Sequence, residues 1–218
     1  MTLAIFDLDN TLIGGDSDTS WGDFLCRKGF VDPEEHTRRH EEYYQDYLNG
    51  TLDIMDFLRF QLEILTRHDV DILHTLRDEY ISEMIKPIVL PKAKELVEQH
   101  RNQGHQLLIV TATNRFITEP IAQLFGIDEL IATEPEMING RYTGNVAGTP
   151  SFAEGKVIRL EEWLADRDHS LEGSWFYSDS HNDLPLLKKV ENPIAVDPDE
   201  KLKEEAEKRG WKVMSLRD

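Results

Sequence analysis

The chain has very little cysteine and no long apolar run. Its 218 residues include a single cysteine, Cys26, so no internal disulfide can form. No group of cysteine and histidine residues has the spacing of a zinc site. No segment approaches the run of about 20 apolar residues that a membrane-spanning helix needs, and the N-terminus lacks the basic stretch of a signal peptide. These absences predict a cytoplasmic protein that does not contact a membrane.

Basic residues are also scarce. The chain has 24 Lys and Arg residues against 42 Asp and Glu residues, a net charge of −18 at pH 7. A protein that binds nucleic acid or an anionic membrane needs a basic stripe to neutralise phosphates, and this sequence has none. With 39% hydrophobic and 30% charged residues, the composition is that of a globular protein. We therefore expect a small-molecule partner and no nucleic acid, with the chain acting as a monomer or homodimer.

Apolar strands alternate with helices over most of the chain. Continuous apolar runs, typical of strands buried on both faces, occupy residues 3–6, 106–112, 130–133, 174–178 and 194–196. Helical patterns lie between them at residues 91–104, 116–125, 156–164, 184–190 and 201–209. Asn139-Gly140 indicates a hairpin turn. This alternation predicts an α/β fold, a Rossmann-like three-layer core with a mostly parallel sheet.

The stretch from residue 14 to residue 87 has a different character. Its apolar residues recur at helical spacing and no strand-like run appears in it. Gly14 and Gly15 break the chain directly after the first strand, and Asp32-Pro33 marks a helix boundary. We expect residues 14–87 to form an all-helical unit inserted after the first strand, and residues 1–13 and 88–218 to form the core.

Polar residues follow three of the predicted strands. Asp7 and Asp9 follow the first strand, Thr111 ends the second, and Asp179 and Asp183 follow the third. Ligands of parallel sheets bind beyond the carboxyl ends of the strands, so these side chains are expected to meet in one crevice. Repulsion among the carboxylates needs a compensating cation, and a few carboxylates with water ligands suit Mg²⁺. Nothing in this set favours a softer metal.

A lysine and the order of these residues lead to a family resemblance. Lys156, at the start of the helix before the third of these strands, could reach the same crevice and hold an anion. The stretch Asp7–Thr11, then Thr111, Lys156 and the stretch Asp179–Asp183 resemble the four ordered motifs of the haloacid dehalogenase-like phosphatase superfamily. The helical insert resembles the C1 cap of its subfamily IB, the phosphoserine-phosphatase-like group. One departure is a serine at 178, where the fourth motif often has glycine.

The resemblance implies a chemical role for each motif residue. Asp7 would be the nucleophile and would form an aspartyl-phosphate. Asp9 would be the general acid that protonates the leaving group and then the base that activates water. Thr111 would hydrogen-bond the phosphoryl oxygens, and Lys156 would neutralise their charge. The implied activity is that of a Mg²⁺-dependent phosphoric monoester hydrolase.

The resemblance also implies the metal site. Asp7, the main-chain carbonyl of Asp9, and Asp179 would bind Mg²⁺, and Asp183 would support the site from behind. Asp7, beside the metal and the lysine, is then expected to stay ionised, whereas Asp9 should be able to hold a proton. This predicts opposite pKa environments for two carboxyls that are two residues apart. His181, next to Asp179, either takes part in the chemistry or fills the turn.

The helical insert is expected to select the substrate. Asp16, Asp18 and Trp21 lie just past the first motif and are candidates to contact it, although Asp16 also suits a helix N-cap. Ala112 and Asn114, next to Thr111, are further substrate-binding candidates.

Two substrates fit the sequence. Histidinol phosphate carries an amine and an imidazole but no carboxylate, so acids and an aromatic surface suit it, and the stretch Gly14–Asp18 resembles the histidinol-phosphatase-type branch. Phosphoserine is the alternative, and its carboxylate would call for an arginine. Arg38, Arg39 and Arg59 are equal candidates for that arginine.

Two other classes of protein remain for comparison. A phospho-accepting signalling module shares the α/β layout, the acidic site and the lysine, but such a module has no helical insert after its first strand. A nucleotide-binding module would show GxGxxG or GxxxxGK[ST] after a strand, and this sequence contains neither there.

Overall fold

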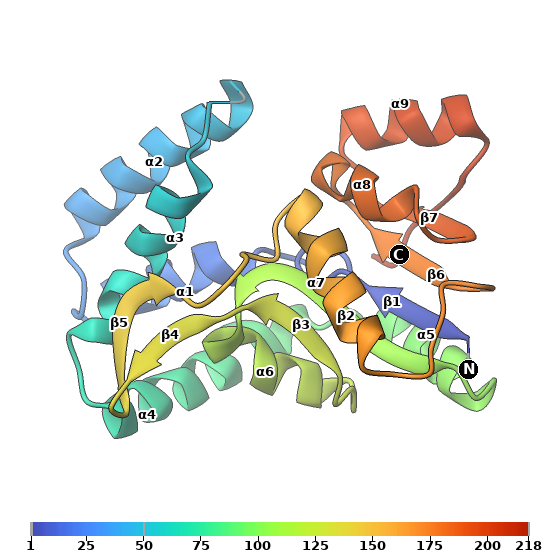
Figure 1. Cartoon of the computed structure of the whole chain (residues 1–218). Helices are drawn as coiled ribbons and strands as arrows, with labels where there is room; N and C mark the ends of the chain where they lie inside the picture. The colour runs from blue at the N-terminus through green and yellow to red at the C-terminus, as the bar shows by residue number, and fades with distance from the viewer. Residues whose placement is uncertain (1, 50, 218) are drawn as a thin grey trace.

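The computed structural model describes residues 2–49 and 51–217 (Figure 1). Its main sheet has six parallel strands in the order β3-β2-β1-β6-β7-β8. The strands are β1 Leu3–Phe6, β2 Gln106–Asn114, β3 Leu130–Thr133, β6 Trp175–Ser178, β7 Asn192–Val196 and β8 Lys212–Met214. A separate antiparallel hairpin consists of β4 Pro135–Ile138 and β5 Arg141–Val146. The predicted α/β fold with a mostly parallel sheet is confirmed.

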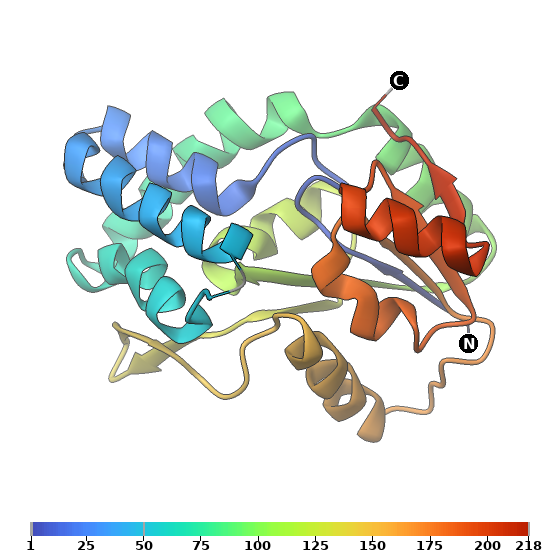
Figure 2. The same ribbon diagram turned by 90° about the horizontal axis from the view of Figure 1, so that it is seen from above.

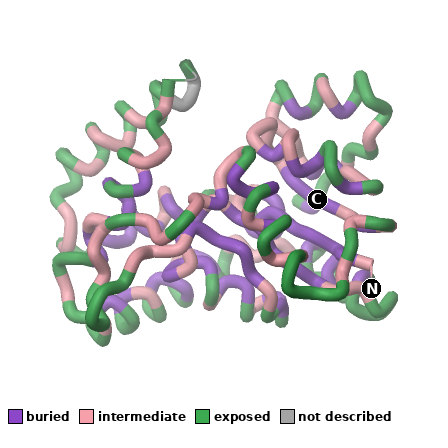
Figure 3. Tube along the Cα trace, viewed as in Figure 1, coloured by how far each residue is buried: buried purple, intermediate pink, exposed green. Residues whose placement is uncertain are grey.

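The sheet is buried on both faces, because its central strand is apolar at every position. Ala4 and Phe6 of β1 contribute to one hydrophobic core, and Leu3 and Ile5 contribute to the other. The first core is covered by α5 Pro91–Asn102 and α6 Arg115–Leu124. The second is covered by α7 Glu154–Ala165, α8 Leu184–Leu187 and α9 Glu200–Arg209. Figure 3 shows these strands as the buried centre of the molecule.

The described residues of the insert form helices and the loops that join them, and no strand. Its helices are α1 Ser17–Arg27, α2 Pro33–Asn49, α3 Ile54–Leu62 and α4 Val70–Tyr80. The short helical turn η1 Glu63–Thr66 lies between α3 and α4, and the turns η2 Ile81–Ile85 and η3 Lys86–Ile88 follow α4. In Figures 1 and 2, α1, α2 and α3 lie at one end of the molecule and α9 lies at the other. An isolated bridge between Ile13 and Val89 joins the chain where it leaves the core to the chain where it returns. The hairpin strand β5 packs against α3 and η1.

Several element ends differ from the sequence-based expectation. Strand β2 continues to Asn114 because Asn114 still pairs with Thr133 of β3. The helix expected at 184–190 is α8, which ends at Leu187 and follows a 3₁₀ turn, η4 His181–Asp183. The hairpin turn is as predicted, since Asn139 and Gly140 have φ of 51° and 76°, as a two-residue hairpin loop requires. Within the described ranges, no helix is both long and apolar enough to cross a membrane.

Candidate active site

The three strand ends meet because β2, β1 and β6 are neighbours in the sheet. Asp7 directly follows β1, and its main-chain N–H donates to the carbonyl of Tyr177 in β6 at 2.9 Å. A cavity of about 580 Å³ lies at this edge of the sheet. Its lining includes the six motif residues to which the resemblance gives a role, Asp7, Asp9, Thr111, Lys156, Asp179 and Asp183.

Lys156 lies at the centre of a buried group of charges. It is 3% exposed, and its ammonium donates to Asp7 Oδ1 and to Asp183 Oδ2, each at 2.8 Å. Burial alone would lower the pKa of Lys156, but the charges of Asp183 and Asp7 outweigh it and hold the pKa above its ordinary value. Ser178 Oγ also donates to Asp183 Oδ2, at 2.7 Å. The serine that replaces the usual glycine of the motif therefore helps to hold Asp183.

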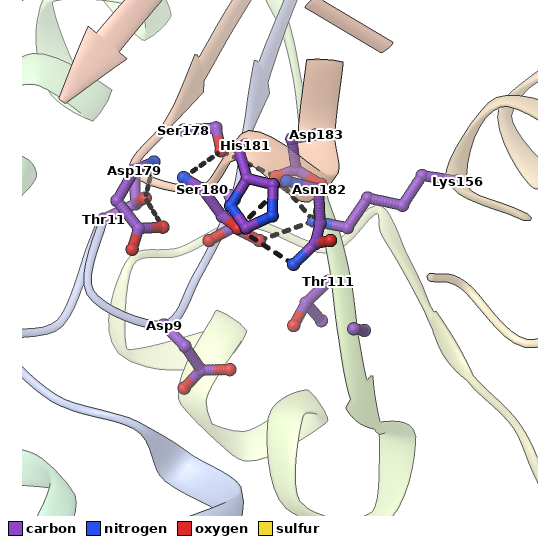
Figure 4. Close-up of polar contacts among 12 residues, drawn as sticks. Asp9, Thr11, Thr111, Lys156, Ser178, Asp179, Ser180, His181, Asn182 and Asp183 are labelled. Carbon is purple, nitrogen blue, oxygen red and sulfur yellow. Dashed lines mark hydrogen bonds and ion pairs between the residues drawn. The ribbon is translucent and has the colours of Figure 1, made fainter. Parts of the chain in front are cut away.

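Asp179 is held by a different partner. The hydroxyl of Thr11 donates to Asp179 Oδ1 at 3.2 Å, and the main-chain N–H of Asp179 donates back to Thr11 Oγ1 at 3.1 Å (Figure 4). Burial raises the pKa of Asp179 to about 8, and the charges of Asp7 and Asp183 add to this rise. The single ammonium of Lys156 does not balance these carboxylates, so this part of the cavity suits an additional cation.

The donor set decides which cation fits. Among residues 2–49 and 51–217, no group of three acidic, histidine or cysteine side chains is arranged to hold a metal by itself. A cation between Asp7 and Asp179 would complete its shell with main-chain and water oxygens, which is the usual arrangement around Mg²⁺. The residues present therefore fit Mg²⁺ and do not fit a zinc site.

Asp9 is turned toward the insert. Its Oδ1 accepts from the main-chain N–H of Ser17 at 2.7 Å, and its Oδ2 accepts from the hydroxyl of Thr113 at 2.9 Å. Burial, followed by the charges of Asp16 and Asp7, raises the pKa of Asp9 to about 7. Burial also raises the pKa of Asp7, but only to about 6, because Lys156 opposes the rise. Both pKa values are raised, and that of Asp9 is raised more than that of Asp7. That Asp7 stays ionised beside a bound metal remains a prediction.

The two acids of the insert have separate partners. Asp16 is the N-cap of α1, since its Oδ1 accepts from the N–H of Thr19 at 2.7 Å, and it also lines the cavity. Asp18 lines the cavity as well but is 8% exposed, and it accepts from Asn114 Nδ2 at 3.2 Å. Burial, with the charges of Asp16 and Asp9, holds the pKa of Asp18 well above its ordinary value. Asp16 is therefore the N-cap of α1, and its contact with the substrate remains a prediction.

The structure does not bring Trp21 to the cavity. Trp21 is 2% exposed and lies against Phe24, Tyr80 and Phe116, with ring centroids 5.1 to 6.1 Å away. Its place on α1 faces the hydrophobic core, because an amphipathic helix presents its largest apolar side chains there.

Four other candidate residues also lie away from the cavity lining. Asn114 is buried behind it, where Asn114 Oδ1 caps α6 by accepting from the N–H of Ile117. The three candidate arginines pair with acids on the helices around them, Arg38 with Glu42, Arg39 with Glu63 and Arg59 with Asp56. Ala112 does line the cavity, beside Thr111.

Several lining residues come from α2 and α3 and were not among the predicted site residues. They are His40, Glu41, Tyr43 and Tyr44 of α2, and Ile54, Phe57 and Leu58 of α3. The spacing of residues 40, 43 and 44 indicates one helix face, but periodicity does not separate a core face from a face that lines a cavity. Thr113, two residues after Thr111, was also missed.

His181 has a structural partner. Its ring Nδ1 and its main-chain N–H both lie 2.8 Å from Asp199 Oδ2. Asp199 is in turn the N-cap of α9. These contacts join the loop after β6 to α9, and His181 is not part of the cavity lining.

Comparison with known proteins identifies the class. The model of the haloacid dehalogenase-like hydrolase family matches residues 4–188. The chain therefore belongs to the haloacid dehalogenase-like hydrolases, and the expected enzyme class, a phosphoric monoester hydrolase, is confirmed.

Individual proteins of known sequence or structure are also similar to this chain. A histidinol-phosphatase of Neisseria meningitidis serogroup C (strain 8013) is 47% identical over 99% of both chains. The phosphoserine phosphatase SerB1 of Mycobacterium tuberculosis (strain ATCC 25618 / H37Rv) is 28% identical over 98% of this chain and 70% of its own length. A solved structure of a protein of unknown function from Bordetella pertussis Tohama I has a TM-score of 0.94 and 44% identity, covering 99% and 100% of the two chains. A phosphoserine phosphatase structure at 20% identity has a TM-score of 0.71, covers 99% and 93%, and shares the fold.

Proposed function

We propose that the chain is a Mg²⁺-dependent phosphatase of a small amine-bearing metabolite that lacks a carboxylate, with histidinol phosphate as the substrate. The observation that carries this proposal is the charge of the cavity. Among the described residues that line it, Lys156 is the sole Lys or Arg side chain, and the opposite wall is made of acids and aromatic rings. The identity of 47% to a histidinol-phosphatase supports the same substrate.

The two ends of the cavity suit the two ends of that substrate. Lys156 and Thr111 mark the end where a phosphate would be neutralised. Asp16, Asp18 and Glu41, which the insert supplies to the lining, offer carboxyl groups to an ammonium. Aromatic rings from α2 and α3 offer a surface on which an imidazole can stack. A substrate carboxylate would meet acids in this cavity instead of an arginine, which disfavours phosphoserine.

The contacts of Asp7 suit it to attack phosphorus. Lys156 holds Asp7 Oδ1 at 2.8 Å, and the substrate phosphate would lie between this carboxylate and the Thr111 hydroxyl. Attack by Asp7 forms an aspartyl-phosphate and breaks the bond from phosphorus to the leaving oxygen, which takes a proton from Asp9. Asp9 then removes a proton from the water that hydrolyses the intermediate. Most of the catalysis comes from positioning and charge neutralisation, as is general for phosphoryl transfer.

The metal site would use few protein ligands. Asp7, Asp179 and the main-chain carbonyl of Asp9 would hold Mg²⁺, and Asp183 would hold Lys156 from behind. When bound, Mg²⁺ neutralises charge on the phosphoryl oxygens. Lys156 and Thr11 keep the two carboxylates in place for it, through the contacts described above.

We also propose a separate function for each of the two parts of the chain. Residues 14–87 would act as a cap that selects the substrate, because α2 and α3 supply the aromatic wall of the cavity. Residues 1–13 and 88–218 would act as the catalytic core, because they supply all four motifs.

A comparison of three phosphate esters tests the proposed identity of the substrate. Phosphoserine carries an amine and a carboxylate, phosphoethanolamine has the amine without the carboxylate, and histidinol phosphate adds the imidazole. Phosphate release should rise in kcat/KM in that order, should need Mg²⁺ and should stop with EDTA. Asp7→Asn should abolish it, because an amide cannot act as the nucleophile. A higher kcat/KM for phosphoserine than for both other esters would overturn the substrate, and activity retained by Asp7→Asn would overturn the intermediate.

A further inference from the structure

Thr113 is a threonine of β2 whose hydroxyl lies within hydrogen-bonding distance of the proposed acid, Asp9. Thr113 is 5% exposed, lies at the cavity, and donates from Oγ1 to Asp9 Oδ2 at 2.9 Å. Its own main-chain N–H donates to Thr111 Oγ1 at 3.2 Å. The same short stretch of β2 therefore contacts both the general acid and the residue placed at the phosphate.

The carboxyl of an aspartate needs such a partner. Rotation about the terminal bond of Asp has broad minima, so the rotamer alone does not fix the plane of the carboxyl group. Here both oxygens are held, Oδ1 by the N–H of Ser17 on α1 and Oδ2 by Thr113. These two contacts come from the insert and from the core, and together they set the direction of the carboxyl group of Asp9.

The chemistry explains why a hydroxyl suits this position. In the first step Asp7 bonds to phosphorus, the ester bond breaks, and the proton of Asp9 moves to the leaving oxygen, which departs as a neutral alcohol. In the second step water bonds to phosphorus, the bond from Asp7 to phosphorus breaks, and the proton of that water moves to Asp9. A carboxyl oxygen accepts a hydrogen bond in both the ionised and the neutral state of the group, and a hydroxyl can rotate to keep donating to it. The hydroxyl of Thr113 can therefore stay bonded to Asp9 in both states and leave the proton of neutral Asp9 free for the leaving oxygen.

We infer that Thr113 is a positioning residue, which orients Asp9 for proton transfer to the leaving group. This inference rests on the proposed role of Asp9 but not on the identity of the substrate. Thr113 therefore has a different role from Thr111, two residues earlier on the same strand, which is proposed to bind the phosphate.

The leaving group of the substrate provides the test. An alkyl phosphate needs a proton on its departing oxygen, whereas the phenolate of p-nitrophenyl phosphate leaves without one. The value of kcat/KM reports the step that releases the leaving group, so it separates the two cases. Because general acid catalysis contributes about 100- to 10,000-fold, Thr113→Val should lower kcat/KM for the alkyl ester about ten-fold or more. For p-nitrophenyl phosphate the loss should stay below about three-fold if proton transfer alone is affected.

Two further variants complete the experiment. Thr113→Ser keeps the hydroxyl and should restore kcat/KM for the alkyl ester to near the wild-type value. Thr118→Val is the matched control, since Thr118 is fully buried on α6 and its hydroxyl donates to the carbonyl of Asn114 at 3.0 Å, away from Asp9. It should match the wild type with both esters, and circular dichroism should show all variants folded.

Three results would overturn the inference. They are equal losses with both esters in Thr113→Val, no loss with either, and a Thr113→Ser protein as impaired as Thr113→Val. The alkyl ester is histidinol phosphate or, if the enzyme does not hydrolyse it, the best alkyl monoester of the panel. Failure of the proposed substrate therefore leaves this comparison intact.

Discussion

The stability of the protein should depend on pH through one buried histidine. His100, at the end of α5, is 4% exposed, with Nε2 2.7 Å from the Tyr177 hydroxyl and Nδ1 2.7 Å from Nδ1 of His105. Burial, with a smaller effect of His105, lowers the pKa of His100 to about 4. In the unfolded chain a histidine has a pKa of about 6.5. The folded protein therefore keeps His100 neutral while the unfolded chain takes up a proton.

The sign and size of the effect follow from this difference. Because the pKa of His100 is lowered in the folded state, its contribution to the free energy of unfolding is fully present above about pH 6.5. This contribution is lost as the pH falls toward about 4, because the unfolded chain binds the proton more tightly than the folded protein does. From the folded and unfolded pKa values, proton linkage predicts that the free energy of unfolding falls by at most about 2 kcal/mol between about pH 7.5 and about pH 5. Because His105 contacts the ring and is itself half-buried, we expect about 1 to 2 kcal/mol.

Urea unfolding at the two pH values measures this loss. His100→Gln removes the titrating ring and keeps an amide that can bond Tyr177, so its loss between the two pH values should be smaller than that of the wild type by the amount above. The buried carboxyls are shared by both proteins, so their contribution cancels in the comparison. His74→Gln, at an exposed histidine of α4, is the control and should keep the wild-type dependence. An equal loss in His100→Gln and the wild type would refute the reasoning.

Three further predictions concern the site and its supports. Lys156→Met should lower the free energy of unfolding by about 3 to 5 kcal/mol, since it leaves buried carboxylates without their ammonium; a loss below about 1 kcal/mol in urea unfolding with EDTA would contradict this. Gly155→Ala should lower both Tm and phosphate release, because a Cβ there would lie 2.0 Å from the carbonyl oxygen of Pro150; unchanged values of both would show that the loop can yield. Tyr44→Ala should raise KM for histidinol phosphate about three- to ten-fold through lost ring contact, and change KM for phosphoethanolamine less; equal changes would rule out stacking on this ring.

The fold was largely predictable because the core strands contain continuous apolar runs. Residues 3–6 and 130–133 were predicted as strands and match β1 and β3 at both ends. Once strands and crossover helices are placed, a parallel sheet brings the residues after neighbouring strands to one edge. This is why Asp7 and Asp179, far apart in the chain, line one cavity.

The wall of the cavity formed by the insert was not predictable in the same way. Helical spacing shows which side chains share a face, but the orientation of that face depends on contacts with distant elements. Trp21 was expected at the substrate and lies in the core, whereas Tyr44, 49% exposed, lines the cavity. Burial is equally hard to read from a sequence, and it raises the pKa of Asp7 by more than Lys156 lowers it.

The position of β1 in the sheet also has a consequence for folding. β1 is synthesised before both of its neighbours in the sheet. It pairs with β2, where Leu3 lies opposite Gln106, and with β6, where Ala4 lies opposite Trp175. Such long-range pairing is slow, because a large loop must close before any contact forms. Until β6 has been synthesised, one edge of this fully apolar strand has no partner, and unpaired apolar edges promote aggregation. The strand that directly precedes the proposed nucleophile is thus made before both of its partners and is complete only after β6 has been made.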